Sequence, residues 1–194
     1  MLVRAALELF TTRGYERTTV DEITEAVEVS QRTFFRYFAG KEEAAFAVQA
    51  MTDARFVASV RARPAHEAPM EALRRAVLDD WDELGAAIES VVPVELYLRM
   101  CRVVESTPAL VAAHLRRSAE TEEQVARVLA EREGLDVDAD PRPRLVVAVF
   151  GGVLRVTERQ WCVDGAEGLR AVRELTAAYL DRVGPALTGN WRAS

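Results

Sequence analysis

Features that mark several other classes of protein are scarce or missing in this sequence. The chain has only two cysteines, Cys101 and Cys162, and no CxxC or Cys/His pattern accompanies either of them. We therefore expect buried thiols rather than a disulfide framework or a zinc site. No signal peptide opens the chain, and the longest apolar run, Leu145 to Leu154, is about half of what a membrane span needs. These absences predict a soluble, cytoplasmic protein.

Patterns typical of β-strands are also scarce. Runs of Val, Ile and Thr with period-two alternation are missing, whereas Ala, Leu, Glu and Arg, which favour helices, dominate the composition. Hydrophobic residues make up 49% of the 194 residues, which is enough to bury a substantial core. The sequence therefore predicts an all-α protein.

The formal net charge of −6 argues against a protein that is coated by nucleic acid. The net charge is compatible with a small basic DNA-binding part, here called the head, on an otherwise acidic protein. This is because phosphates attract positive charges only within roughly 8 Å at physiological salt. Between Ser30 and Lys41 the charged residues are Arg32, Arg36 and Lys41, with no acid among them. This segment is the candidate for such a head.

Apolar spacing and capping residues divide the chain into about nine helices. In chain order we expect them at residues 2–10, 20–26, 31–38, 41–60, 70–91, 94–104, 108–133, 145–162 and 169–183. Two spacings fit a capping box before the second helix, Thr18 with Asp21 and Thr19 with Glu22.

Two short helices joined by about three or four residues, at 20–26 and from 31 onward, fit a helix-turn-helix. In that motif the first helix crosses the DNA backbone, where hydroxyls such as those of Thr18 and Thr19 can hold a phosphate. The second helix, capped by Ser30, enters the major groove, so its first turn meets base edges. Gln suits adenine N6 and N7, and Arg suits guanine O6 and N7. The pattern alone also fits a small helical subdomain whose basic residues are ordinary solvated charges.

Residues 3–46 resemble the N-terminal domain of TetR-family repressors. The resemblance rests on VRAALELF, Gly14-Tyr15, Thr18-Thr19-Val20, Ile23, Val29-Ser30, Thr33-Phe34-Phe35-Arg36-Tyr37-Phe38 and Lys41. It implies an all-helical homodimer with a ligand-binding C-terminal domain, which leaves its palindromic operator in double-stranded DNA when ligand binds. By position, it implies base contacts from Gln31, Arg32 and Thr33. It implies phosphate contacts near Thr18, Thr19, Tyr37 and Lys41, and Ser30 and Arg36 complete the predicted DNA-binding set.

Three departures from the family pattern bear on DNA affinity. Glu28 stands in the turn where the family usually has glycine, and a left-handed residue there costs about 1–2 kcal/mol. Phe35 replaces a frequent tyrosine, so one phosphate-binding hydroxyl is missing. The chain begins at Met1-Leu2 without the basic arm that commonly precedes the first helix. This predicts either an arm trimmed by the choice of start or weaker DNA binding.

We expect a DNA-binding domain at residues 1–46, joined by a long helix to a larger ligand-binding and dimerisation domain at residues 47–194. The segment from Leu145 to Leu154 has no polar face, so we expect it to be covered once by its own domain and once by a partner chain. A four-helix dimer bundle is the economical arrangement, and packing of both seams within one chain is the alternative. The predicted interface residues are Leu145, Val149, Gly152, Val153, Val156, Leu169, Val172, Thr176, Tyr179 and Val183.

A ligand pocket would lie among the middle helices, where large or polarizable side chains gather. The candidates are Trp81, Tyr97, Met100, Cys101, His114, Phe150 and Trp161, and for each of them core packing is the alternative role. The TFFRYF segment together with this C-terminal pattern resembles TetR-family members that sense fatty acyl or other amphipathic molecules. We therefore expect a small, largely apolar or amphipathic effector.

We expect no cofactor and no metal. Asp136, Asp138 and Asp140 resemble the start of a calcium loop, but the glycine and the closing glutamate of such a loop are absent, so a solvated linker is the better interpretation. His114 lacks a Cys, Asp or second His at metal spacing. Two other classes remain as alternatives, an enzyme built on a helical bundle and an adaptor that uses the head for protein contacts. No Ser/His/Asp set, Cys/His pair or phosphate loop supports an enzyme.

Overall fold

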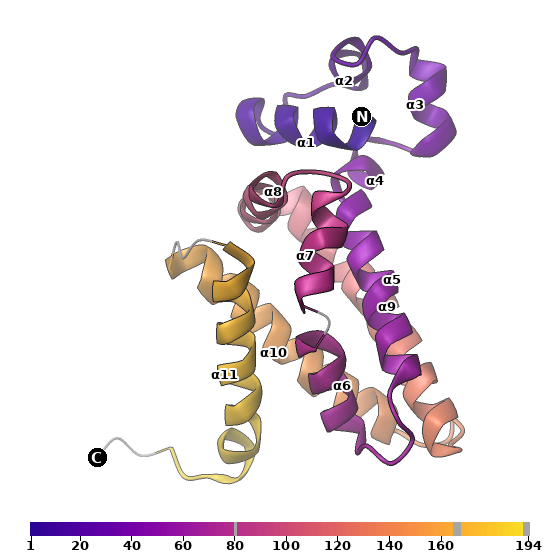
Figure 1. Ribbon diagram of the computed structural model, residues 1–194, viewed down its shortest axis with the longest axis vertical. Coiled ribbons are helices and arrows are strands. Elements are labelled where there is room, and N and C mark those ends of the chain that lie inside the picture. Colours follow the sequence, from indigo (N-terminus) through magenta and orange to yellow (C-terminus); the bar gives the residue numbers. More distant parts are fainter. Residues whose placement is uncertain (80, 165–167, 192–194) are drawn as a thin grey trace. The chain divides into compact units, whose positions relative to one another are not determined.

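The computed structural model describes residues 1–79, 81–164 and 168–191. Over these residues the chain is α-helical, with no β-strand (Figure 1). The helices are α1 (Leu2–Arg13), α2 (Val20–Glu25), α3 (Gln31–Tyr37), α4 (Lys41–Ala45), α5 (Ala47–Ala62), α6 (Pro69–Leu78), α7 (Trp81–Glu89), α8 (Val94–Ser106), α9 (Pro108–Glu133), α10 (Arg142–Asp164) and α11 (Gly168–Thr188). None of these helices is long and apolar enough to cross a membrane. The all-α prediction is confirmed.

The described residues form two compact units. The first contains residues 1–58 and 81–121, and the second contains residues 59–79, 122–164 and 168–191. The boundary between the units falls within α5 and within α9, so each of these helices contributes residues to both. The domain division predicted at residue 46 is a different one, and it stays a prediction.

The three N-terminal helices share a small apolar core in the first unit. Leu7 and Phe10 are fully buried because the apolar residues of α1 recur at helical spacing. Ile23 of α2 and Phe34 of α3 are fully buried as well, and the Phe34 and Phe38 ring centroids lie 5.3 Å apart. Truncating a core phenylalanine costs about 3–5 kcal/mol. α2 packs against α1 and against α3, so this core holds the three helices together.

Side-chain caps determine where α2 and α3 begin. Of the two capping-box spacings, the one with Thr19 and Glu22 forms. The Glu22 N–H donates to the Thr19 hydroxyl at 3.3 Å, and the Glu22 carboxylate accepts from the Thr19 N–H at 2.8 Å. The predicted cap of α3 is confirmed, since the Ser30 hydroxyl accepts from the Thr33 N–H.

The single helix predicted from Lys41 to Val60 is wrong, because the chain leaves the helical conformation at Phe46. α4 ends at Ala45, Phe46 has φ −97° and ψ 8°, and α5 begins at Ala47. The Phe46 side chain is buried, and its ring stacks on the imidazole of His114 in α9 with centroids 6.3 Å apart. Tertiary packing of this ring therefore overrides the helix propensity of its neighbours.

The helix predicted from residue 70 to 91 is also two helices. α6 ends at Leu78 with Asp79 as its C-cap, and α7 begins at Trp81; residue 80 lies outside the described residues. Aspartate is a poor helix former, and the Asp79 carboxylate accepts from Arg63 at 3.1 Å. The two interruptions explain why the described residues form eleven helices rather than about nine.

The second unit packs α10 against α11 and α6. Val147, Phe150 and Trp161 lie on the buried face of α10. On the other face of the same helix, Leu145 is 61% exposed and Val156 is 59% exposed. α10 is thus apolar on both faces, and the part of the chain that the structure describes covers only one of them.

Candidate nucleic-acid interface

A short turn joins α2 to α3 and contains the one described non-glycine residue with positive φ. Glu28 has φ 53°, and the Val29 N–H closes the turn by donating to the Thr24 carbonyl at 3.0 Å. The left-handed residue expected where the family has glycine is therefore present, at a strain of about 1–2 kcal/mol. The turn holds α2 and α3 in the arrangement of a helix-turn-helix.

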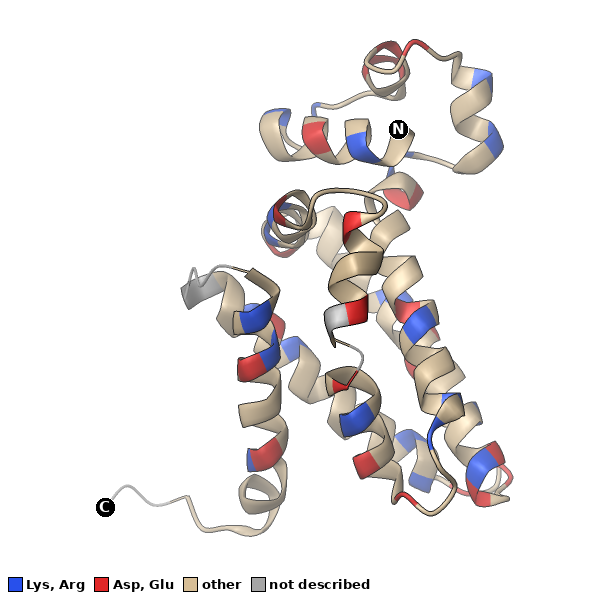
Figure 2. Cartoon of the chain, viewed as in Figure 1, with Lys and Arg blue, Asp and Glu red and all other residues tan. Residues whose placement is uncertain are grey.

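Apart from the exposed ring of Phe35, the outward surface of α3 is polar, basic and accessible. Gln31, Arg32, Arg36 and Tyr37 are all exposed, Tyr37 by 58%. Figure 2 shows basic but no acidic residues on α3, whereas α2 carries acidic residues. A helix that is anchored on one face by Phe34 and basic on the other fits the major groove of DNA, which is about 12 Å wide.

The side chains in the first turn of α3 differ in the hydrogen bonds that they already make within the protein. The Ser30 and Thr33 hydroxyls lie 3.1 Å apart, and the Ser30 hydroxyl caps α3 by accepting from the Thr33 N–H. The Gln31 amide nitrogen donates to the Asp21 carboxylate of α2. Arg32 has no hydrogen bond or ion pair with the described residues. Of the three predicted base readers, Arg32 is therefore the one whose polar head is fully available.

The two threonines before α2 serve the local fold. Thr18 is 1% exposed, and its hydroxyl donates to the Gly14 carbonyl at 2.9 Å. The Thr19 N–H and hydroxyl bond the Glu22 carboxylate, and these bonds, the backbone one first, hold the pKa of Glu22 below its usual value. Thr18 thus lies inside the head, and Thr19 meets a phosphate only when its capping box opens. The phosphate contacts of both residues stay predictions.

Lys41, the only lysine of the chain, contacts the loop between α1 and α2. Its Nζ donates to the carbonyls of Tyr15, Glu16 and Thr18 at 2.9, 3.3 and 3.2 Å. Nζ also lies 4.4 Å from the Tyr15 ring centroid, and burial raises the pKa of the Tyr15 phenol. An ammonium has three donors, and each has an acceptor here. Lys41 therefore ties the start of α4 to the head, and its phosphate contact stays a prediction.

Arg36 and Tyr37 form one exposed polar pair at the end of α3. Arg36 Nη2 donates to the Tyr37 hydroxyl at 2.9 Å, and the guanidinium carbon lies 4.8 Å from the Tyr37 ring centroid. A guanidinium has five N–H donors, so this pair keeps donors for a phosphate. Phe35, where the family often has tyrosine, is exposed and offers an apolar surface instead.

The residues predicted for a ligand pocket are divided between the two units. Trp81, Tyr97, Met100, Cys101 and His114 belong to the first unit, and Phe150 and Trp161 belong to the second. In the first unit the Tyr97 hydroxyl donates to Gln49 at 3.0 Å, and the Gln49 amide donates to Asp53 at 2.8 Å. No one unit brings the whole set together, and the pocket stays a prediction.

The residues predicted for dimerisation lie on α10 and α11. Most of them are exposed or half-buried. Thr176 differs, because it is buried and its hydroxyl donates to the Val172 carbonyl at 2.7 Å. Thr176 thus packs within its own unit, and the interface itself stays a prediction.

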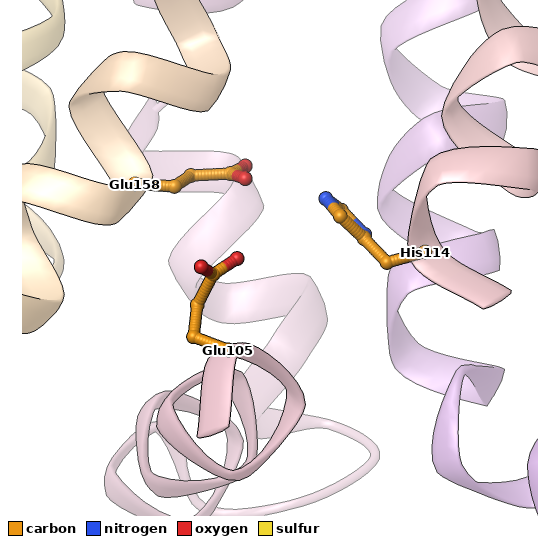
Figure 3. A group of neighbouring side chains, drawn as sticks. All are labelled: Glu105, His114 and Glu158. Atoms are coloured by element: carbon orange, nitrogen blue, oxygen red, sulfur yellow. The ribbon is translucent and has the colours of Figure 1, made fainter. Parts of the chain in front are cut away.

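Figure 3 draws three side chains that have the chemistry of metal ligands, Glu105, His114 and Glu158. Glu105 of α8 and His114 of α9 belong to the first unit, whereas Glu158 of α10 belongs to the second. One unit therefore supplies two of them, and zinc sites use three or four protein ligands. We infer no metal site from this group.

Sequence reasoning missed two residues that position the interface. Asp21 was expected only as part of a cap, yet its carboxylate holds the Gln31 amide ten positions away. Tyr15 was expected only as part of a family motif, yet it supplies both a carbonyl and a ring to Lys41. Neither pair has a spacing that a helix or capping rule covers, so the sequence carries no signal for them.

These features together define a class of protein. Two short capped helices, a tight turn and an exposed basic second helix form the reading head of a helix-turn-helix DNA-binding protein.

Comparison with known proteins identifies the family. Residues 2–48 match the family model for bacterial regulatory proteins of the tetR family, and residues 67–188 match the model for the MftR C-terminal domain. The chain is 44% identical over 191 residues to the HTH-type transcriptional regulator TcmR of Streptomyces glaucescens. The matched region covers 98% of this chain and 84% of that protein. A solved transcriptional regulator from Aquifex aeolicus has the same fold, with a TM-score of 0.57, 15% identity and coverage of 94% of this chain and 96% of that chain. The chain belongs to the TetR family, whose members are DNA-binding transcriptional regulators and not enzymes.

Proposed function

We propose that this regulator is a repressor that binds a palindromic operator as a homodimer and leaves it when a small, largely apolar or amphipathic molecule binds. The exposed, acid-free and basic surface of α3 carries the proposal. Arg32 is positioned to read a guanine, and Gln31 to read an adenine, each good pair giving about 1–3 kcal/mol of discrimination. Arg36 and Tyr37 at the other end of α3 are positioned to bind phosphates, which fix the register of the helix on DNA.

Dimerisation is supported by the uncovered apolar face of α10. Leu145 and Val156 lie 61% and 59% exposed on a regular helix, and burial of such a side chain stabilises by about 1.5–3 kcal/mol. Gly152 is half-buried on the same helix and lets a second backbone approach closely. A two-fold dimer presents two copies of α3 to half-sites roughly 34–36 Å apart, so the operator should be palindromic.

The side chains of the first unit support an amphipathic effector. Its middle helices contribute apolar residues such as Met100 and Leu96, which are buried, and the hydrogen-bonded series from Tyr97 through Gln49 to Asp53. A ligand site typically combines an apolar lining with a few placed polar groups. A molecule with an apolar body and one polar end would match this combination.

Contacts between α9 and α4 support the coupling of ligand binding to the head. Arg116 bonds the Glu42 carboxylate at 3.2 Å. The Phe46 ring stacks on His114, and the Arg117 guanidinium lies 5.3 Å from the Phe46 ring centroid. A ligand that displaces His114 would therefore move α4, which is tied to the head by Lys41. Coupling of about 1–3 kcal/mol between ligand and operator is typical of such systems.

The DNA part of the proposal is tested by selecting binding sites from random double-stranded oligonucleotides. We expect an enriched palindrome whose half-sites are separated by about one helical turn. Enrichment of no sequence would favour the adaptor alternative, and enrichment of single, unpaired half-sites would contradict the dimer.

The ligand part is tested by measuring affinity for a compound found by thermal-shift screening, with and without operator DNA. Because coupling is reciprocal, operator should weaken the compound by the same factor by which the compound weakens operator, about 5- to 150-fold. Equal affinities in the two states would show that the compound fills a pocket without acting as an inducer.

A further inference from the structure

One hydrogen bond between the two helices of the helix-turn-helix involves a predicted base-reading side chain. Gln31, the first residue of α3, donates from Nε2 to the carboxylate of Asp21 in the first turn of α2. Both residues are exposed, so the bond lies on the surface of the head. It contributes nothing to the apolar core that already holds the two helices together.

The bond restricts what Gln31 presents to DNA. The amide of an unrestrained glutamine side chain rotates and can present either its oxygen or its nitrogen to a base. A carboxylate only accepts hydrogen bonds, so Asp21 selects the orientation in which Nε2 lies toward α2. One N–H and the Oε1 acceptor remain, and this pair of groups complements the N7 acceptor and the N6 donor of adenine.

The negative charge of Asp21 weakens binding to DNA of any sequence. A carboxylate beside the reading helix repels phosphates, and α3 itself has no acid. Asp21 therefore lowers the affinity of the head for any DNA, and it also restricts the orientation of the Gln31 amide.

We propose that Asp21 is a specificity-determining residue, which acts by fixing the amide of Gln31 in the orientation that reads adenine. The proposal rests on the proposed function in one respect, that the first turn of α3 reads bases. Preorganisation of this kind raises discrimination because the correct contact no longer loses side-chain freedom on binding.

Two substitutions at position 21 separate orientation from charge. Asp21→Ala removes both the acceptor and the charge, whereas Asp21→Asn removes the charge and keeps an amide oxygen that can accept from Gln31. The measurement is the affinity of each dimer, at fixed salt, for operators that carry each of the four bases at every half-site position. Affinity for unrelated DNA is measured alongside.

We expect Asp21→Ala to lower the preference for adenine at one half-site position by about fivefold or more, which is the lower end for one base contact. Asp21→Asn should keep that preference within about twofold of the parent. Both variants should bind unrelated DNA more tightly than the parent. In a Gln31→Ala background, Asp21→Ala should change no base preference further.

The outcomes distinguish this inference from the function on which it rests. If Gln31→Ala lowers the adenine preference and Asp21→Ala does not, the positioning role of Asp21 is overturned while base reading by α3 stands. Equal losses in Asp21→Ala and Asp21→Asn would assign the effect to charge and overturn the role as well. If Gln31→Ala changes no base preference, reading by Gln31 is itself refuted, and the role of Asp21 with it.

Discussion

The Lys41 ammonium lies 4.4 Å from the centre of the Tyr15 ring and donates to the Tyr15 carbonyl at 2.9 Å. This contact makes the start of α4 and the loop between α1 and α2 one structural piece. A compact ammonium suits the site because its three donors meet three carbonyls, whereas the planar guanidinium of arginine presents its donors in a fixed fork. The single lysine of the chain stands at the point where movement of α4 would reach the reading head.

Lys41→Met should lower the free energy of unfolding by about 1.5–3 kcal/mol, since hydrogen bonds of a charged donor are lost. Lys41→Arg should not restore the stability. Arg36→Ala is the matched comparison, because Arg36 is exposed; it should leave stability unchanged and reduce the salt slope of log K by about 0.9 per half-site. Urea titration and DNA binding at several salt concentrations measure both quantities. A reduced slope with unchanged stability in Lys41→Met would make Lys41 a phosphate contact instead.

Glu28→Gly should stabilise the head by about 0.5–1 kcal/mol. Glycine removes a strain of about 1–2 kcal/mol at φ 53°. Part of this gain is lost, because glycine raises the conformational entropy of the unfolded chain. Glu28→Ala is the control, since alanine removes the carboxylate and keeps the strain. If both variants gain equally in urea titrations, the effect is one of charge and not of the backbone.

Val156→Glu should break the dimer. The substitution places an unpaired charge on the uncovered face of α10. When a partner buries that face, dimerisation should weaken by about 3 kcal/mol, which raises the dimer dissociation constant roughly a hundredfold. Leu115→Glu is the matched control, because Leu115 is a similarly exposed apolar residue on α9. Light scattering should show monomers for the first variant and dimers for the second. An intact Val156→Glu dimer would place the interface elsewhere.

The second unit should lose stability in acid because of Glu67. This carboxylate is 4% exposed and bonds Arg63 and Arg75 at 2.5 and 3.0 Å, and Arg63, then Arg75, lower its pKa from 4.5 to about 2. Ionised Glu67 therefore stabilises the folded state above pH 4.5, and this contribution disappears as the pH falls toward 2. Glu67→Gln should be less stable at neutral pH and should show a smaller loss between pH 4.5 and 2. An unchanged acid dependence would exclude Glu67 as its source.

Local signals predicted the head well. Ser30 caps α3 as expected, and one of the two capping-box spacings predicted before α2, that of Thr19 with Glu22, forms, because capping depends on residues three positions apart. The interruption at Phe46 was not predictable in the same way, because it depends on a ring stacked against His114 from a distant helix. Helix propensity gives a continuous helix there, and tertiary packing decides otherwise.

The roles of individual site residues were harder to predict than their location. Thr18 and Thr19 have the same side chain, yet one hydroxyl is buried against Gly14 and the other belongs to a capping box. Which threonine lies inside depends on the path of the loop, and no pattern of apolar spacing records that path. The exposed face of α3 was predictable, because Phe34 marks the buried face and a helix has a fixed period.

The base preference of Arg32→Ala tests most directly the central claim that the first turn of α3 reads DNA sequence. The measurement is affinity at constant salt for operators that carry each of the four bases at every half-site position. Arg32→Ala should lose about 1–3 kcal/mol of discrimination at one base pair per half-site and keep the parent preferences at the others. Equal weakening for every base at every position would show that Arg32 binds phosphate, and it would contradict the account.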